Sequence, residues 1–215
     1  MARQRGGTQP TPLSAEDVLD AALCLVERSG LDRLTVRAVA DELGVTPPAV
    51  HYHLRGGEDL ADRVIEAVAA RIEIRIDPDA HWADQYVALV RSMDRTFLRY
   101  PGTGMRVLTA SRDSAAAARL TRTALSILGS AGLDEPVAVE MFTATYLLFT
   151  GWLATRGLGE AGTTHPALAA AGVDASGMAD GSVLERAVRR LLETPSEAGP
   201  VSARLPKHSM IRRNE

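Results

Sequence analysis

The sequence is poor in aromatic residues and in cysteine. Only 4% of its 215 residues are Phe, Trp or Tyr, whereas Ala, Leu, Val and Arg are plentiful. This balance favours helices over strands. The single cysteine, Cys24, excludes an intramolecular disulfide framework and suits a reducing compartment. We expect it to be a small packing residue in a helix, because no second cysteine is present to resolve an oxidised thiol.

The chain also lacks a recognisable signal peptide and a clear membrane span. Its first residues are polar and contain Gly and Pro, without an apolar core. The one long apolar run, residues 137–154, contains Glu140 and three threonines. We therefore interpret this run as a buried helix of a bundle and expect a cytoplasmic protein with no membrane partner.

Neither sign of charge dominates, since the formal net charge is −3. Residues 1–63 contain 7 basic and 10 acidic residues, so the N-terminal part accounts for the whole excess. This composition excludes a protein that coats nucleic acid nonspecifically. Any affinity for phosphate must come from the placement of individual charges.

Helical patterns fill most of the chain, and no strand pattern or internal repeat is visible. Four short patterns come first, from Ser14 to Gly30, Thr35 to Gly44, Thr46 to about Leu54, and Glu58 to the Asp77-Pro78-Asp79 break. Longer ones follow over residues 82–97, 114–129, 135–156 and 183–192, with a short helical turn at 105–110 and a loop rich in Gly, Ala and Thr at 157–181. The expected fold is all-α, with a flexible arm (1–12), a helix-turn-helix domain with its connector helix (13–76), a helical effector-binding and dimerisation domain (77–194) and a disordered tail (195–215).

The most informative segment is residues 34–57, LTVRAVADELGVTPPAVHYHLRGG. Two short helices joined by a tight glycine turn present the second helix outward, as DNA reading in the major groove requires. Val45, Val50 and Leu54 supply an apolar inner side for that helix. From Leu43 to Gly57 there is one basic residue, Arg55, and no acid. The predicted DNA face is therefore free of local repulsion.

This segment resembles the DNA-binding signature of the TetR family. The resemblance covers about residues 14–70 and rests on the Leu-Thr-x-Arg start, Ala40, Leu43-Gly44-Val45, and an aromatic/His pair before a glycine-bearing turn. It implies an all-α dimer that binds operator DNA and a small-molecule effector. Residues implied to contact phosphate are Thr35, Arg37, Thr46, Tyr52 and His53, and those implied to face bases or the groove are Pro47, Pro48, Ala49 and His51.

Arg55 completes the predicted DNA-binding set, and Arg3 and Arg5 on the arm are further candidates for the minor groove or the backbone. Two positions depart from the family's pattern: His51 replaces the usual aromatic residue, and Gly57 replaces a common phosphate-binding lysine. Loss of one phosphate contact lowers the salt dependence of binding by about one unit without abolishing it. We predict no metal site at His51 and His53, because the side chains of residues two apart on a helix point about 200° away from each other.

The effector pocket is expected among the thioethers and amphipathic aromatic residues of the C-terminal half. The predicted lining residues are Tyr86, Met93, Phe97, Met105, Thr109, Met141 and Tyr146. Plain core packing is the alternative for each of them, and the effector stays unidentified. Dimerisation is expected on residues 114–129, 135–156 and 182–193, where Ala144, Gly151 and Ala154 permit close approach.

These patterns predict a ligand-responsive transcriptional regulator, by default a repressor that binds a palindromic operator as a homodimer and is released by a small molecule. We find no nucleophile–base pairing, phosphate-cradling loop or metal-ligand cluster, so we expect no enzyme activity and no cofactor. Two alternatives remain open. One is an all-helical small-molecule-binding protein or enzyme without DNA binding, and the other is a related scaffold that has lost DNA binding.

Overall fold

A computed structural model describes residues 12–54, 57–109, 114–160, 170–172 and 181–193. Within these ranges every regular element is a helix, which confirms the all-α prediction. The helices are α1 (Ala15–Ser29), η1 (Leu31–Arg33), α2 (Val36–Leu43), α3 (Pro47–His51), α4 (Gly57–Ala70), α5 (Trp82–Arg99), α6 (Thr103–Thr109), α7 (Ala115–Ser130), α8 (Glu135–Glu160) and α10 (Gly181–Leu192). The predicted arm up to residue 11, the tail from 195 and most of the 157–181 loop lie outside the described residues.

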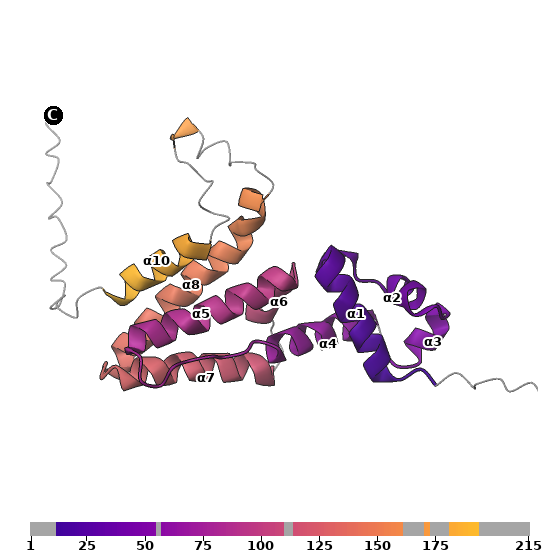
Figure 1. Cartoon of the computed structure of the whole chain (residues 1–215), viewed down its shortest axis with the longest axis horizontal. Coiled ribbons are helices and arrows are strands. Elements are labelled where there is room, and N and C mark those ends of the chain that lie inside the picture. Colours follow the sequence, from indigo (N-terminus) through magenta and orange to yellow (C-terminus); the bar gives the residue numbers. More distant parts are fainter. Residues whose placement is uncertain (1–11, 55–56, 110–113, 161–169, 173–180, 194–215) are drawn as a thin grey trace, which may run out of the picture.

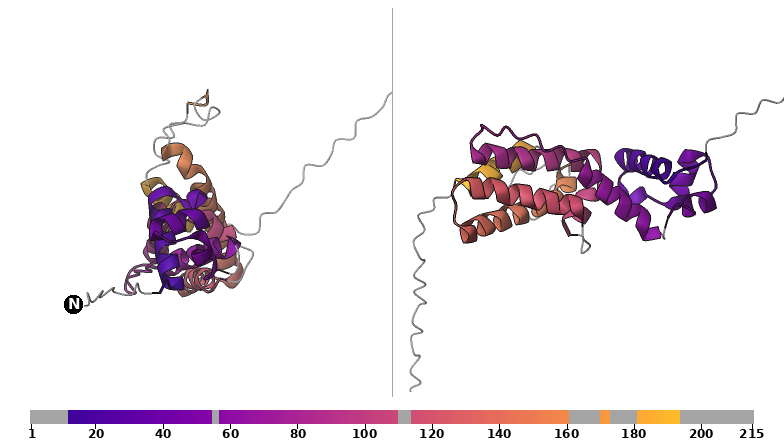
Figure 2. Two further views of the ribbon diagram at one scale, coloured as in Figure 1. Left: turned by 90° about the vertical axis from the view of Figure 1, so that its right-hand side faces the viewer. Right: turned by 90° about the horizontal axis from the view of Figure 1, so that it is seen from below.

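The described part of the chain is elongated, with two groups of helices at opposite ends (Figure 1). Helices α1 to α3 form one end, and α5 to α8 with α10 form the other, as the view from below also shows (Figure 2, right). Helix α4 lies between them and packs against α1 on one side and against α6 and α7 on the other. A change at either end can therefore reach the other through α4.

The first helix begins where its capping residues predict. The Ser14 hydroxyl accepts a hydrogen bond from the Asp17 amide at 3.0 Å, and the Asp17 carboxylate accepts one from the Ser14 amide at 2.8 Å. The Ser14 hydroxyl also donates to this carboxylate at 2.6 Å, and this bond, together with the one from the Ser14 amide, holds the pKa of the Asp17 carboxyl below its usual value. The helix ends at Gly30, whose φ of 80° suits a residue without a side chain.

Cys24 corrects one expectation, because it is exposed and does not pack in the core. The buried face of α1 includes Val18, Ala22, Leu25 and Val26. Cys24 follows Ala22 by two positions, which on a helix is about 200° around the axis and hence on the far side. The predicted helix is confirmed, but Cys24 lies on its exposed face and not on its buried one.

The fourth helix is shorter than predicted, since it ends at Ala70 and not at the Asp77-Pro78-Asp79 break. After it the chain alternates between isoleucines and charged residues at 72–76. Ile72 is buried at 1% exposure, whereas Glu73 and Arg75 are exposed. This period of two fits an extended segment with one face on the core, and it was the signal that the helical interpretation missed.

Two further contacts join the ends of the molecule beside α4. The Leu31 amide donates to the Pro101 carbonyl oxygen at 2.9 Å, and the Arg99 guanidinium pairs with Glu27 at 2.9 Å. Gly102 has a φ of 83°, and a side chain there would place its Cβ 3.1 Å from that of Leu31. The loop between α5 and α6 is thus fitted closely to the end of α1.

Candidate functional site

The turn between α2 and α3 depends on Gly44. Its φ of 65° lies in the left-handed region, and its amide donates to the Asp41 carbonyl oxygen at 3.3 Å. The Val45 amide then donates to the Ala40 carbonyl oxygen at 3.0 Å and turns the chain into α3. An ion pair between Arg28 and Glu42 at 2.6 Å fixes α2 against α1. These contacts orient the short α3 helix.

The inner side of α3 is apolar, as predicted. Val50 is fully buried, and Val45 and Leu54 are half-buried and pack against the core. Pro47 and Pro48 occupy the first helical turn, where their missing amide hydrogens leave no bond unmade. The α-helical part ends at His51, earlier than the predicted Leu54, although hydrogen-bonded turns continue to Leu54.

The outer side of α3 carries most of the predicted DNA-contacting residues. Thr46, Pro47, Pro48, His51 and Tyr52 are exposed, and Ala49 and His53 are half-buried. Tyr52 is 87% exposed, and its ring meets that of His53 edge-on at 5.3 Å between centroids. The Thr46 hydroxyl makes no capping hydrogen bond, so it can bond a partner outside the chain.

Thr35 and Arg37 lie together at the start of α2, and both are exposed. The Thr35 oxygen accepts a hydrogen bond from the Ala38 amide at 3.0 Å, which leaves the hydroxyl hydrogen for another acceptor. A helix N-terminus with a free hydroxyl and a guanidinium suits a phosphate group. Arg55, Arg3 and Arg5 lie outside the described residues.

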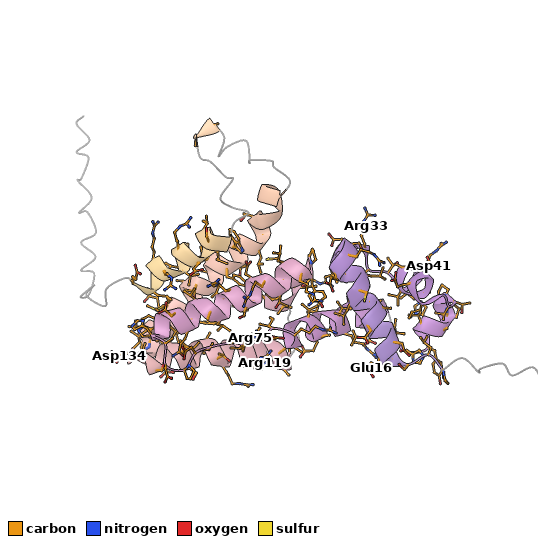
Figure 3. The ribbon with its side chains drawn as sticks, viewed as in Figure 1. Glu16, Arg33, Asp41, Arg75, Arg119 and Asp134 are labelled. Carbon is orange, nitrogen blue, oxygen red and sulfur yellow. The ribbon has the colours of Figure 1, made fainter. Side chains whose placement is uncertain are left out.

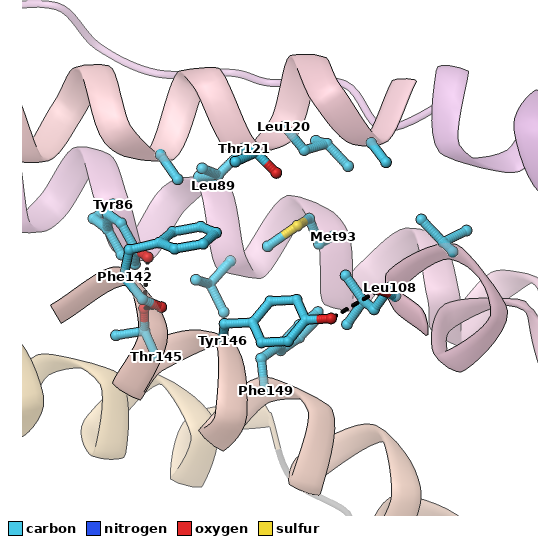
Figure 4. Close-up of a pocket in the computed structure, with 14 residues that line it drawn as sticks. Tyr86, Leu89, Met93, Leu108, Leu120, Thr121, Phe142, Thr145, Tyr146 and Phe149 are labelled. Atoms are coloured by element: carbon cyan, nitrogen blue, oxygen red, sulfur yellow. Dashed lines mark hydrogen bonds between the residues drawn. The ribbon is translucent and has the colours of Figure 1, made fainter. Parts of the chain in front are cut away.

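A cavity of about 90 Å³ lies at the other end of the molecule, enclosed by α5, α6, α7 and α8 (Figure 4). Its lining contains aliphatic, aromatic and hydroxyl-bearing side chains and, among the described residues, no charged one. The lining residues are Tyr86, Leu89, Val90, Met93, Val107, Leu108, Ala117, Leu120, Thr121, Ala124, Phe142, Thr145, Tyr146 and Phe149.

Three of the seven predicted ligand residues line this cavity: Tyr86, Met93 and Tyr146. The other four are Phe97, Met105, Thr109 and Met141, and they lie outside it. Phe97 is buried against Gly104, where an added Cβ would come within 3.0 Å of the ring. Thr109 is exposed, and its hydroxyl donates to the Met105 carbonyl oxygen of its own helix.

The predicted set of lining residues contained none from α7, although this helix forms one wall of the cavity. Ala117, Leu120 and Ala124 share one face of that helix, and the two small side chains leave space that the cavity occupies. A search for thioethers and aromatic residues overlooks alanines. Small residues at helical spacing on an inward face are the signal that could have found this wall.

The phenol hydrogens of the two lining tyrosines, Tyr86 and Tyr146, are both used in hydrogen bonds within the protein. The Thr145 hydroxyl lies 2.9 Å from the Met141 and Phe142 carbonyl oxygens and donates its one hydrogen to them. Tyr86 therefore donates to the Thr145 oxygen at 2.6 Å, and Tyr146 donates to the Leu108 carbonyl oxygen at 2.8 Å. Burial raises the pKa of Tyr86 above its ordinary value, despite the opposing bond to Thr145. The phenol oxygens keep free lone pairs, so the tyrosines offer acceptors to a ligand.

Helix α8 has an apolar surface that a single copy leaves uncovered. Val139 is 48% and Leu147 64% exposed, and Gly151 and Ala154 lie further along the same exposed side. Within the described residues, Glu135–Thr155 is long and apolar enough to span a membrane by length and composition, and 22% of its most apolar window is buried. The helix also packs against α6, α7 and α10, as a core helix of a bundle does.

Comparisons with known proteins agree with these features. Residues 18–64 match the family model described as bacterial regulatory proteins, tetR family. The chain is 28% identical over 197 residues to the tetracycline repressor protein class A from transposon 1721 of Escherichia coli, covering 90% of this chain and 86% of that protein.

Two solved structures share the fold. The TetR family protein ActR of Streptomyces coelicolor in complex with actinorhodin superposes with a TM-score of 0.63 at 20% identity, covering 88% of this chain and all of that one. BioQ with its double-stranded DNA operator superposes with a TM-score of 0.55 at 23% identity, covering 66% of this chain and 86% of that one. The chain therefore belongs to the tetR family of bacterial regulatory proteins and is a transcription regulator.

Proposed function

We propose that the protein is a repressor that binds a palindromic operator as a homodimer and leaves it when a small uncharged molecule enters the cavity between α5 and α8. It acts in the cytoplasm, where the chromosome lies. The observation that carries the proposal is the orientation of α3. Val50 on its inner side is fully buried, whereas the Tyr52 side chain on its outer side is 87% exposed. A repressor of this kind needs a reading helix, a second copy and a ligand site that is linked to both.

The exposed residues of α2 and α3 have distinct roles in this proposal. Thr35, Arg37, Thr46, Tyr52 and His53 bind backbone phosphates and fix the register of the protein on the duplex, a role to which Arg55 also contributes. Pro47, Pro48, Ala49 and His51 face the major groove, where their small or polar side chains approach the base edges. Two such helices, about 34–36 Å apart or a multiple of this distance, read successive half-sites.

The second copy pairs through the uncovered side of α8. The exposed Val139 and Leu147 need an apolar partner, and Gly151 and Ala154 permit a close approach of two backbones. A twofold axis brings the same face of two copies together and buries both at once. Helix α10 borders α8 and extends this interface.

The cavity favours an uncharged ligand that carries a hydrogen-bond donor. No described lining residue would neutralise a charge, and a charge buried without a partner is strongly unfavourable. The free acceptors of Tyr86 and Tyr146 match a hydroxyl or amide hydrogen. At about 90 Å³ the cavity is smaller than the ~300–1,000 Å³ of typical ligand sites, so entry of a ligand must displace side chains or helices.

Helix α7 connects this cavity with α4 through four hydrogen bonds, two to Glu66 and two from Arg119. The Glu66 carboxylate of α4 accepts hydrogen bonds from the Ser114 hydroxyl at 2.5 Å and the Ala116 amide at 3.1 Å, at the start of α7. In return, Arg119 of α7 donates to the Ala69 and Ile72 carbonyl oxygens at 3.2 and 3.4 Å, at the end of α4. A ligand that moves α7 therefore moves α4, and with it the spacing of the two reading helices.

A mobility-shift assay with DNA from beside the protein's own gene tests the proposal. We expect the full chain to retard a palindromic fragment as a dimer. Arg37→Ala and Tyr52→Ala should each weaken binding about tenfold, or ~1.4 kcal/mol. Arg37→Ala should also lower the salt dependence by about one unit, because the arginine neutralises a phosphate charge, whereas Tyr52→Ala should leave the salt dependence unchanged. Arg106→Ala is the matched control, because Arg106 is an exposed arginine of α6 at the other end of the molecule.

The proposal fails if the folded full chain retards no such fragment at low salt. It also fails if the Arg106→Ala control weakens binding as much as Arg37→Ala does. In that case only the total charge, and not the position of α2 and α3, would matter.

A further inference from the structure

A second cavity, separate from the effector pocket, lies at the junction of the two ends of the molecule. This cleft of about 350 Å³ is bounded by the segment after α4 and by the second half of α5. Four arginines line it, Arg71, Arg75, Arg95 and Arg99, against one carboxylate, Glu73. The two cavities share no lining residue. The proposed repressor mechanism does not use this second one.

The four arginines differ in how far their charges are neutralised. Arg99 is held by Glu27 through two nitrogens, and Arg75 pairs with Glu73. Arg71 approaches Asp20 only to 3.8 Å. Arg95 makes no ion pair with any described residue, and its one bond is a long contact of 3.5 Å to the Ser92 hydroxyl. Two guanidinium groups of the cleft are therefore available to an incoming anion.

The cleft also contains a buried phenol group that pairs with none of the described residues. Tyr100 lines the cleft at only 4% exposure. Within the part of the chain that the structure describes, its phenol forms no hydrogen bond, and the Arg99 guanidinium lies 5.5 Å from its ring centre. A buried donor without an acceptor is unfavourable, so a bound oxyanion would satisfy it. Ser92, equally buried, adds a second hydroxyl to the lining.

We propose that this cleft binds a small phosphorylated molecule, in which a phosphate or diphosphate group bridges Arg71 and Arg95. The planar fork of arginine matches the oxygens of phosphate, and the cleft volume falls at the lower end of the range of ~300–1,000 Å³ for small-molecule sites. Arg75 lies near the middle of the long axis, away from α3 (Figure 3). Operator DNA bound at α3 is therefore not the occupant.

Such a ligand would fix the end of α4 against α5. Arg71 directly follows α4, whereas Arg95 belongs to α5, and a bridging phosphate holds both. Binding in the cleft would thus act on α4, the helix that connects the DNA-binding end to the rest of the molecule. The cleft would bind an anion, whereas the effector pocket excludes one.

Isothermal titration of the full chain with pyrophosphate at constant ionic strength tests this site. We expect saturable binding of one pyrophosphate per chain. Arg71→Gln with Arg95→Gln should weaken binding at least tenfold, and Tyr100→Phe should weaken it several-fold. The control, Arg106→Gln with Arg122→Gln, removes the same charge from two exposed arginines outside the cleft and should bind as the unaltered chain does.

Equal weakening by the control pair, or no saturation, would overturn the proposal. Citrate at matched ionic strength distinguishes phosphate from carboxylate: competition as strong as that of pyrophosphate would show that the phosphate class is wrong. Arg95→Gln alone serves if the double variant does not fold, since Arg95 is exposed and loses only its long contact to Ser92.

Discussion

Two tyrosines of this chain differ strongly in their surroundings, which predicts how stability depends on pH. Tyr86 is 3% exposed, and burial raises its pKa above the ordinary 10.0, whereas Tyr52 is 87% exposed. Above pH 10 the unfolded chain loses the Tyr86 proton while the folded chain keeps it. The contribution of Tyr86 to the free energy of unfolding is therefore fully present below pH 10. It is lost as the pH rises from 10 through the higher pKa of the folded state.

Tyr86→Phe should make the free energy of unfolding less sensitive to alkaline pH. At neutral pH the variant should lose about 0.5–1.5 kcal/mol, because the hydrogen bond to Thr145 is absent. Urea unfolding at neutral pH and above pH 10 measures both effects. Tyr52→Phe is the control, since its phenol is in water before and after unfolding. A control that changed the alkaline slope as much would contradict the assignment to Tyr86.

The free acceptors in the effector pocket predict which small probes bind it. Naphthol, which is uncharged and donates a hydrogen bond, should bind about tenfold more tightly than methoxynaphthalene, a difference of ~1.4 kcal/mol. Naphthoate should not bind measurably, because its carboxylate would be buried without a partner. Competitive fluorescence titration compares the three. Naphthoate that bound as well as naphthol would rule out the uncharged class.

For single residues, the sequence predicts which side chains are buried or exposed, because this depends on their position around a helix. It does not predict which side chains line a cavity, because this depends on how neighbouring helices cross. Val50 inward and Tyr52 outward follow from spacing alone. The cavity depends instead on how α7 crosses α5, so the spacing of Ala117 and Ala124 indicates an inward helix face but not the void beside it. Phe97 was a reasonable candidate by type, but the close approach of Gly104 directs it into the core.

Among the helices, the pair α4 and α7 carries the clearest prediction. Glu66→Ala removes the acceptor of the Ser114 and Ala116 hydrogen bonds and should cost about 1–3 kcal/mol of stability. Combined with Ser114→Ala in a double-mutant cycle, it should give a coupling energy of at least about 0.5 kcal/mol. Urea unfolding supplies the energies, and amide exchange should report faster opening at the start of α7. Glu16→Ala, on the exposed side of α1, is the comparison. Strictly additive energies would exclude the contact as a link.

Helix ends were predictable where a local cap marks them. Ser14 with Asp17 and the left-handed Gly44 placed the boundaries of α1 and α2 within one residue. The end of α4 has no such cap within the chain's local sequence. Its contact comes from Arg119, 47 or more positions later, which donates to the Ala69 carbonyl oxygen in the last turn and to the Ile72 carbonyl oxygen just beyond the helix. In the neighbouring sequence only the alternation at 72–76 marks the change, and it indicates an extended segment without fixing the last helical residue.

On the scale of the whole molecule, composition alone leaves the environment of α8 ambiguous. The helix satisfies the length and hydropathy of a membrane span, yet it is packed on one side by α6, α7 and α10. A long helix that is apolar all round and only half covered by its own chain needs a second protein surface or a lipid one. The match to the tetR family and the presence of a reading helix favour a second copy.

The proposed dimer predicts that one charge on α8 separates the two copies. Leu147→Glu should convert the dimer into a folded monomer, because Leu147 is 64% exposed in one copy and would bring two like charges together on the twofold axis. Leu98→Glu is the matched control, since Leu98 is 50% exposed but lies on α5. Analytical ultracentrifugation measures the mass, and circular dichroism measures the helical content. Operator affinity should fall by about 100-fold or more, because a monomer contacts a single half-site and loses about 2.7 kcal/mol or more. A Leu147→Glu protein that remained dimeric, or a Leu98→Glu protein that dissociated equally, would place the interface elsewhere.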